Sequence, residues 1–218
     1  MEICILASIS PGISDFRKNT KSKWPKNHIF ESMRRLATLL VILTLALFCS
    51  SHSNQQLLYF TDSGKIGFTS DAPLEVIKAN STNLAGILNL SDRSFSFSIP
   101  MNSFQGFNSA LQKTHYNENY LETETFPKST FNGKIIEEVN FNSSGTLNVR
   151  AKGKLRIHGI EQDRIIRCTL KIIPGSISVE TQFTVPLQDH DITIPSIVQQ
   201  KIAEVIDVSI SFSMQEMK

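Results

Sequence analysis

Three histidines in the second half of the chain are the residues best suited to acid–base or metal chemistry. His115 opens a polar segment, His158 precedes a glycine, and His190 lies between Asp189 and Asp191. Imidazole titrates near neutral pH and is a common metal ligand. The spacing of these histidines matches no metal-binding motif, and no serine lies in a G-x-S-x-G sequence. We therefore expect no catalytic residue, metal site or cofactor, and a turn or hydrogen-bonding role for His158. His190 and its two aspartates are expected at a turn. A Ser–His–Asp set is left open.

The segments that must position these residues alternate between apolar and polar side chains. Such alternation is typical of β-strands with one buried face. It is clearest in residues 95–101, 147–157, 166–172, 177–187 and 208–214. Turn-forming clusters separate the strand-like runs, at 62–64, 91–93, 132–133, 142–145 and 161–163. Short strands at this spacing predict an all-β sandwich or barrel, with a bend or bulge at Gly153.

Two segments depart from this alternation. Residues 104–122 show no period of two, so we expect a loop with a short helical insertion there. Residues 196–204 place apolar side chains at helical spacing directly after Pro195, with Ser196 as the N-cap, which predicts a short helix. No repeat or low-complexity linker follows residue 54, so residues 54–218 are expected to form a single domain.

The beginning of the chain resembles a secretory signal. Residues 33–35 are Met-Arg-Arg, residues 36–48 are almost entirely apolar, and small polar residues follow. The apolar run is shorter than the ~20 residues that a membrane-spanning helix needs, so residues 33–53 are predicted to be a cleaved signal peptide. Lipid attachment at Cys49 is the less favoured alternative because Phe48 precedes it, where lipoprotein signals have a small residue. Residues 1–32 are then a start-site extension or a disordered leader, and the domain is expected in the periplasm or outside the cell.

The charge balance of the expected domain excludes a strongly basic protein. Seven of the 22 basic residues and three of the 20 acidic residues precede residue 54, which leaves 15 basic and 17 acidic residues. Nucleic-acid binding needs a clustered basic face, so no nucleic-acid partner is expected. Cys168 is the one cysteine after residue 54, and its place in an alternating run predicts a small core side chain rather than a reactive thiol.

Several motifs of this chain, taken in order, resemble those of the YceI-like family. The matching segments are DSGKIGFTSDAPL (62–74), FSFSIPMNSF (95–104), the HYNENYLE segment with the later FP and FNG (115–133), GKLRIHG (153–159) and FTVPLQDHDITIPSIVQQKIAEVIDV (183–208). The resemblance covers residues 57–218. It implies a lipocalin-like antiparallel β-barrel of about eight strands around a long apolar tunnel, in which some members hold a polyisoprenoid or a similar amphiphile.

The resemblance implies a function for the chain. We expect an exported, non-enzymatic carrier of an isoprenoid-like or other long-chain lipid, with transient membrane contact; the oligomeric state, including a dimer, is left open. The alternatives are a structural or stress-related envelope barrel without a stable ligand and a small lipocalin-like enzyme. For His115 the alternatives are a backbone hydrogen bond and contact with a lipid head group.

The expected ligand-binding residues are the large apolar side chains whose strand parity turns them inward. They are Phe68, Phe95, Phe97, Ile99, Phe126, Phe131, Leu155 and Ile157. A register error of one residue would turn a whole strand's set outward. The polar segment 115–135 is expected to cap one end of the barrel, with Phe126 entering the interior.

Overall fold

The computed structural model describes residues 34–40 and 57–217. The chain divides into two units, residues 1–53 and 54–218. In the first unit, residues 34–40 form a short helix, whereas the rest of the predicted signal peptide, Cys49 and residues 1–32 lie outside the described residues. No helix in the described ranges is both long enough and apolar enough to span a membrane.

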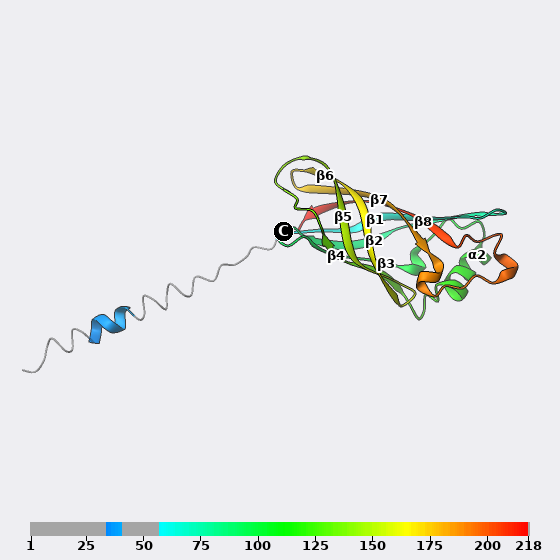
Figure 1. Cartoon of the computed structure of the whole chain (residues 1–218), viewed down its shortest axis with the longest axis horizontal. Helices are drawn as coiled ribbons and strands as arrows, with labels where there is room; N and C mark the ends of the chain where they lie inside the picture. Colours follow the sequence, from blue (N-terminus) through cyan, green and yellow to red (C-terminus); the bar gives the residue numbers. More distant parts are fainter. Residues whose placement is uncertain (1–33, 41–56, 218) are drawn as a thin grey trace, which may run out of the picture. The chain divides into compact units, whose positions relative to one another are not determined.

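Eight antiparallel strands of the second unit form a closed barrel (Figure 1). They are β1 (Leu58–Asp71), β2 (Val76–Asn89), β3 (Ser94–Pro100), β4 (Lys128–Ile135), β5 (Gly145–Ile157), β6 (Ile160–Ile173), β7 (Ser176–Pro186) and β8 (Val205–Glu216). Each strand pairs with its neighbour in sequence, and β8 pairs with β1 to complete the barrel. The predicted all-β barrel of about eight strands is confirmed.

The connections between strands differ greatly between the two ends of the barrel. At the end that we name the mouth, β1 turns into β2, residues 101–127 link β3 to β4, and residues 187–204 link β7 to β8. The short helices of this end are η1 (Met101–Ser103), α2 (Ala110–His115), η2 (Tyr116–Tyr120), η3 (Leu187–His190) and η4 (Ser196–Val198). The opposite, far end has the connections 90–93, 136–144 and 174–175, and β8 ends there (Figure 1).

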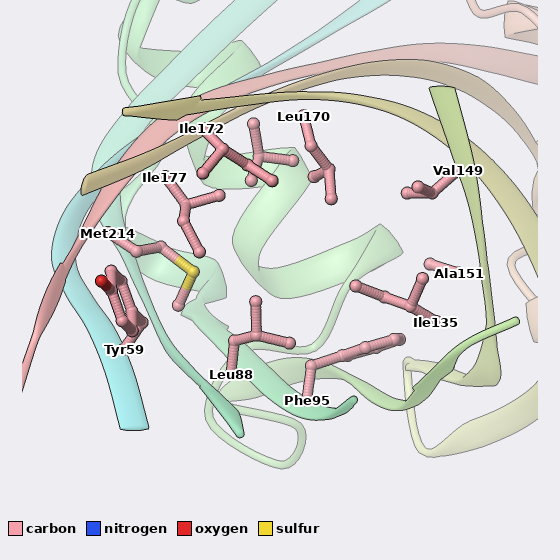
Figure 2. Close-up of a cluster of buried hydrophobic side chains, with 11 residues drawn as sticks. Tyr59, Leu88, Phe95, Ile135, Val149, Ala151, Leu170, Ile172, Ile177 and Met214 are labelled. Carbon is pink, nitrogen blue, oxygen red and sulfur yellow. The ribbon is translucent and has the colours of Figure 1, made fainter. Parts of the chain in front are cut away.

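Inward-facing side chains form two apolar clusters inside the barrel. The far-end cluster includes Leu88, Phe95, Ile135, Leu170 and Met214. Figure 2 shows these side chains pointing into the barrel from strands on all sides. The mouth cluster combines strand residues such as Ile66 and Ile99 with residues of the 101–127 connection, among them Phe104, Tyr116 and Leu121.

Three of the predicted turns are wrong, because the residues that suggested them lie inside strands. Residues 62–64 belong to β1, where the β1–β2 register shifts on both sides of Gly64 and forms a bulge. Residues 161–163 begin β6; the turn lies earlier, at His158 and Gly159, which both have positive φ, 49° and 76°. Two such residues between paired strands match the type I′ hairpin. The predicted turns at 91–93 and 142–145 do connect strands.

The third wrong turn, at 132–133, and the expected bulge at Gly153 have a common explanation. Gly133 of β4 pairs directly with Gly153 of β5, and the pairing of β5 with β6 continues through Gly153 without a register shift. A Cβ atom at Gly133 would lie 2.1 Å from the carbonyl oxygen of Lys152. The two glycines therefore permit a close approach of two backbones rather than a turn or a bulge.

The predicted helix at 196–204 is much shorter than expected. Only residues 196–198 are helical, and a turn follows to residue 201. Ile202 N–H still donates to the carbonyl oxygen of Val198 (3.1 Å), but two backbone groups of this segment bond elsewhere. Leu74 N–H donates to the carbonyl oxygen of Gln200 (2.9 Å), and Ala203 N–H donates to Ser70 Oγ (2.8 Å). These tertiary hydrogen bonds replace the ones that a longer helix would make. The helical insertion predicted at 104–122 is present as α2 and η2.

Candidate functional site

The barrel interior contains one large cavity with a volume of about 580 Å³. All eight strands contribute apolar side chains to its lining, for example Ile66 of β1, Val149 of β5 and Ile206 of β8. The lining includes members of both apolar clusters, so the cavity extends from the mouth into the far half of the barrel. Seven predicted binding residues lie on it, namely Phe68, Phe95, Phe97, Ile99, Phe131, Leu155 and Ile157.

Cross-strand pairing places three of these residues in a row. Phe97 of β3 pairs with Phe131 of β4, and Phe131 in turn pairs with Leu155 of β5. Phe97 also contacts Phe212 of β8, with ring centroids 5.0 Å apart. On its other side, Phe97 pairs with Gly86, where a Cβ atom would lie 2.1 Å from the Phe97 ring. The glycine therefore provides the space that this aromatic side chain occupies.

Phe126 is the exception, and the prediction that it enters the interior is wrong. It is not part of the cavity lining, and its ring packs edge-on against His158 at a centroid distance of 4.7 Å. A Cβ atom at Gly159 would lie 2.7 Å from the Phe126 ring, so the glycine of the β5–β6 turn makes room for it. Phe126 precedes β4 and lies in a loop, where the inward–outward alternation of a strand does not apply.

The 101–127 connection supplies aromatic lining that strand alternation could not reveal. Phe104, Phe107 and Tyr116 line the cavity, and the Tyr116 ring stacks on Phe68 with centroids 5.7 Å apart. The Tyr116 hydroxyl is buried without a hydrogen-bond partner, and burial raises the pKa of this phenol. The signal in the sequence was a cluster of aromatic residues within a segment that is otherwise polar.

Polar lining residues with charged, amide or imidazole groups gather at the mouth. They are Glu75 in the β1–β2 connection, Gln112 and His115 of α2, and Lys201 in the β7–β8 connection. Elsewhere the polar lining consists of hydroxyl groups, as at Ser98 and Thr130, and the Cys168 thiol. Burial raises the pKa of Cys168, which agrees with its predicted role as an unreactive core side chain.

His158 and His190 form hydrogen bonds between two connections at the mouth end. His158 Nδ1 donates to the carbonyl oxygen of His190 (3.1 Å), and His190 Nδ1 donates to the carbonyl oxygen of Ile160 (3.2 Å). These bonds join the β5–β6 turn to η3. Within the described ranges, no three His, Cys, Asp or Glu side chains gather as metal ligands would.

We expect His190 to make the stability of the barrel dependent on pH. The residue is fully buried, and this desolvation lowers its pKa, although Asp189 nearby acts in the opposite direction. In the unfolded chain, His190 therefore becomes protonated near the usual histidine pKa of about 6.5, whereas in the folded protein its protonation requires a lower pH. The stabilisation is complete above that pH and is lost as the pH falls below it.

We expect the free energy of unfolding to decrease between pH 7.5 and 5, as measured by urea titration. The variant His190→Asn removes the titrating group and should give a flatter profile over this interval. Asp92 and Glu137 have lowered pKa values as well, but their carboxylates protonate in a more acidic range. An equal slope in the variant and the unmodified chain would contradict a role for His190.

The family model described as the YceI-like domain matches residues 60–214. No curated protein sequence matches the chain. A structure of a polyisoprenoid binding domain from Saccharophagus degradans, implicated in plant cell wall breakdown, is similar with a TM-score of 0.64 and 12% identity, over 75% of this chain and 100% of that one.

Two further solved structures share the fold. BcnA of Burkholderia cenocepacia is 12% identical, with a TM-score of 0.57 over 69% of this chain and 95% of that one. The YCEI protein of Campylobacter jejuni is 14% identical, with a TM-score of 0.51 over 65% of this chain and 85% of that one. At such identities the structures establish the fold, while the match to the family model spans most of the chain. The chain therefore belongs to the YceI-like family.

Proposed function

We propose that this protein is an exported, non-enzymatic carrier that binds a long apolar lipid, such as a polyisoprenoid-like amphiphile, inside its barrel. The observation that carries the proposal is the cavity of about 580 Å³, whose lining is mostly apolar and comes from every strand. Its volume lies within the range of small-molecule sites, roughly 300–1,000 Å³. A barrel filled by its own side chains, as a purely structural role would predict, would leave no space of this size.

The family supports a binding role over a catalytic one. The similar structure from Saccharophagus degradans is described as a polyisoprenoid binding domain, and this chain belongs to the same YceI-like family. The buried histidines of the mouth end have backbone partners that account for their positions. Export rests on the sequence pattern of residues 33–53, and it places the carrier in the periplasm or outside the cell.

The energetics of an apolar cavity favour a long ligand with little chemical selectivity. Each buried methylene contributes ~0.8 kcal/mol, so about twenty contribute a gross ~16 kcal/mol. The ordering of a flexible chain and the loss of its free motion offset much of that sum. One methylene more or less changes binding by only ~1–3 kcal/mol. We therefore expect a permissive carrier with a preference for chain length.

The direct test is native mass spectrometry of the protein expressed from its full sequence in its own host and purified from that host. The expected spectrum shows protein with one bound lipid, and organic extraction followed by mass spectrometry identifies that lipid. Protein carrying Ala151→Phe, which narrows the cavity, serves as the control and should be recovered largely empty. A spectrum of empty protein alone, from material that was never delipidated, would refute the carrier function.

A further inference from the structure

The mouth of the cavity is built by three segments that are distant in sequence but tied together by hydrogen bonds. Glu75 Oε1 accepts hydrogen bonds from Asn108 Nδ2 (3.2 Å) and Gln112 Nε2 (3.0 Å). These bonds connect the β1–β2 connection to α2 and the residues before it. On the other side, Ala203 N–H donates to Ser70 Oγ (2.8 Å), which connects β1 to the β7–β8 connection. The polar groups of the mouth are therefore held in one place.

The side-chain nitrogen donors that remain available at the mouth belong to a cationic group and an imidazole group. The Tyr116 hydroxyl is a further donor without a partner. The Glu75 carboxylate already accepts hydrogen bonds from two side-chain amides, one of which belongs to Gln112. Lys201 and His115 also line the cavity, and within the described part of the chain neither side chain forms an ion pair or hydrogen bond. Lys113 differs, since its Nζ donates to Gln105 Oε1 (2.9 Å) and it does not line the cavity.

The lining of the far half of the cavity is apolar, in contrast to the polar mouth. This lining includes Leu88, Phe95, Val149, Leu170 and Met214, and contains no charged, amide or imidazole group. Burying a polar group without a hydrogen-bond partner costs several kcal/mol, and an unpaired charge costs far more. An amphiphile in this cavity is therefore more stable with its tail in the far half and its head at the mouth.

We propose that the mouth is a head-group site for an oxyanion, such as a carboxylate or phosphate, with Lys201 and His115 as its donors. This inference rests on the proposed lipid-binding function and adds to it the orientation of the ligand and the chemistry of its head. The tail extends from the mouth towards Phe95 and Met214. The ligand enters tail first and leaves its head nearest to solvent, beside the exposed Leu111 of α2.

Orientation is tested by fluorescence quenching in the full chain. Trp24 is the only tryptophan, so Trp24→Phe gives a silent background for single reporters. Leu111→Trp reports on the mouth, and Phe95→Trp reports on the far half, with Tyr59→Trp as a second far-end reporter if the first variant unfolds. The probes are stearic acids that carry a nitroxide either near the carboxylate or near the terminal methyl.

We expect the nitroxide near the carboxylate to quench the mouth reporter more strongly, and the nitroxide near the methyl to quench the far-end reporters more strongly. The opposite order, or equal quenching of both reporters by both probes, would overturn the proposed orientation while the lipid-binding function stands. Absence of quenching by either probe would overturn the lipid-binding function and the head-group site together.

Head-group chemistry is tested by comparing stearate with stearyl alcohol, which has the same chain but no charge. Lys201→Gln and His115→Gln should each weaken stearate binding roughly three- to fivefold, as expected for a partly solvated ion pair or hydrogen bond, and leave alcohol binding unchanged. Lys113→Gln is the control, because Lys113 belongs to α2, as His115 does, but does not line the cavity. It should change the affinity for neither stearate nor stearyl alcohol. Equal losses for both ligands, or no loss for stearate, would overturn the oxyanion site.

Discussion

Replacing Ala151 with phenylalanine is expected to weaken binding of a sixteen- or eighteen-carbon lipid about a hundredfold. Ala151 of β5 is buried, lines the far half of the cavity, and pairs with Ile135 of β4 and Ile166 of β6. A phenylalanine there occupies space that about four methylenes of the ligand would fill. At ~0.8 kcal/mol each, their loss is worth ~3 kcal/mol, which corresponds to roughly a hundredfold in affinity.

Competition against a fluorescent fatty acid measures this affinity, with far-ultraviolet circular dichroism as the check that the barrel is intact. The neighbouring Lys152 is exposed and points to the outer face of β5, so Lys152→Phe adds a similar side chain outside the barrel and should leave affinity unchanged. Eight-carbon lipids should lose less than long ones. Unchanged binding of long lipids by a folded Ala151→Phe variant would show that they bind somewhere other than this cavity.

Gly133→Ala is expected to destabilise the barrel by about 2–4 kcal/mol, among the largest effects of a single methyl group. The added Cβ atom would lie 2.1 Å from the Lys152 carbonyl oxygen and 2.6 Å from the Gly153 Cα atom. Both are backbone atoms of β5, so no side-chain rotation can relieve the clash and the β4–β5 pairing must separate. For a domain of this size, the expected decrease in Tm is about 5–15 °C.

Gly145→Ala is the matched control, because it adds the same methyl group to a strand glycine, here in β5. No atom lies within 4 Å of a Cβ at this position, and its φ is not positive. Since alanine restricts the unfolded chain more than glycine does, this variant should be unchanged or up to about 1 kcal/mol more stable. Urea titration of both variants provides the comparison. Similar stabilities for the two would contradict the close approach of β4 and β5.

The sequence was sufficient where local side-chain alternation decides the structure. Alternating apolar residues in strands such as 166–172 and 208–214 predicted which face of the sheet turns inward, because successive side chains of a strand point to opposite faces. The same rule placed Phe95, Phe97 and Ile99 on the cavity. It could not place Phe126, which lies in a loop and packs against His158.

Local composition was misleading where glycine and polar residues serve long-range contacts. Asn132-Gly133 reads as a turn, yet Gly133 lies in the middle of a strand because Gly153, twenty residues later, must approach it closely. The apolar spacing of 196–204 predicts a helix, but the carbonyl group of residue 200 and the N–H of residue 203 bond to Leu74 and Ser70 instead. Neither partner can be inferred from the segment itself.

Residue order alone thus determined that the chain forms antiparallel strands with an apolar inner face, and the family motifs indicated a barrel. Only the tertiary structure decided that the interior is hollow, because the same alternating pattern suits a filled barrel, and the difference depends on how strands separated in sequence close around a common axis. It also assembled the polar mouth, where Ser70 bonds to a residue 133 positions away. Alternation follows from the geometry of one strand, whereas a cavity and its mouth follow from the packing of all eight.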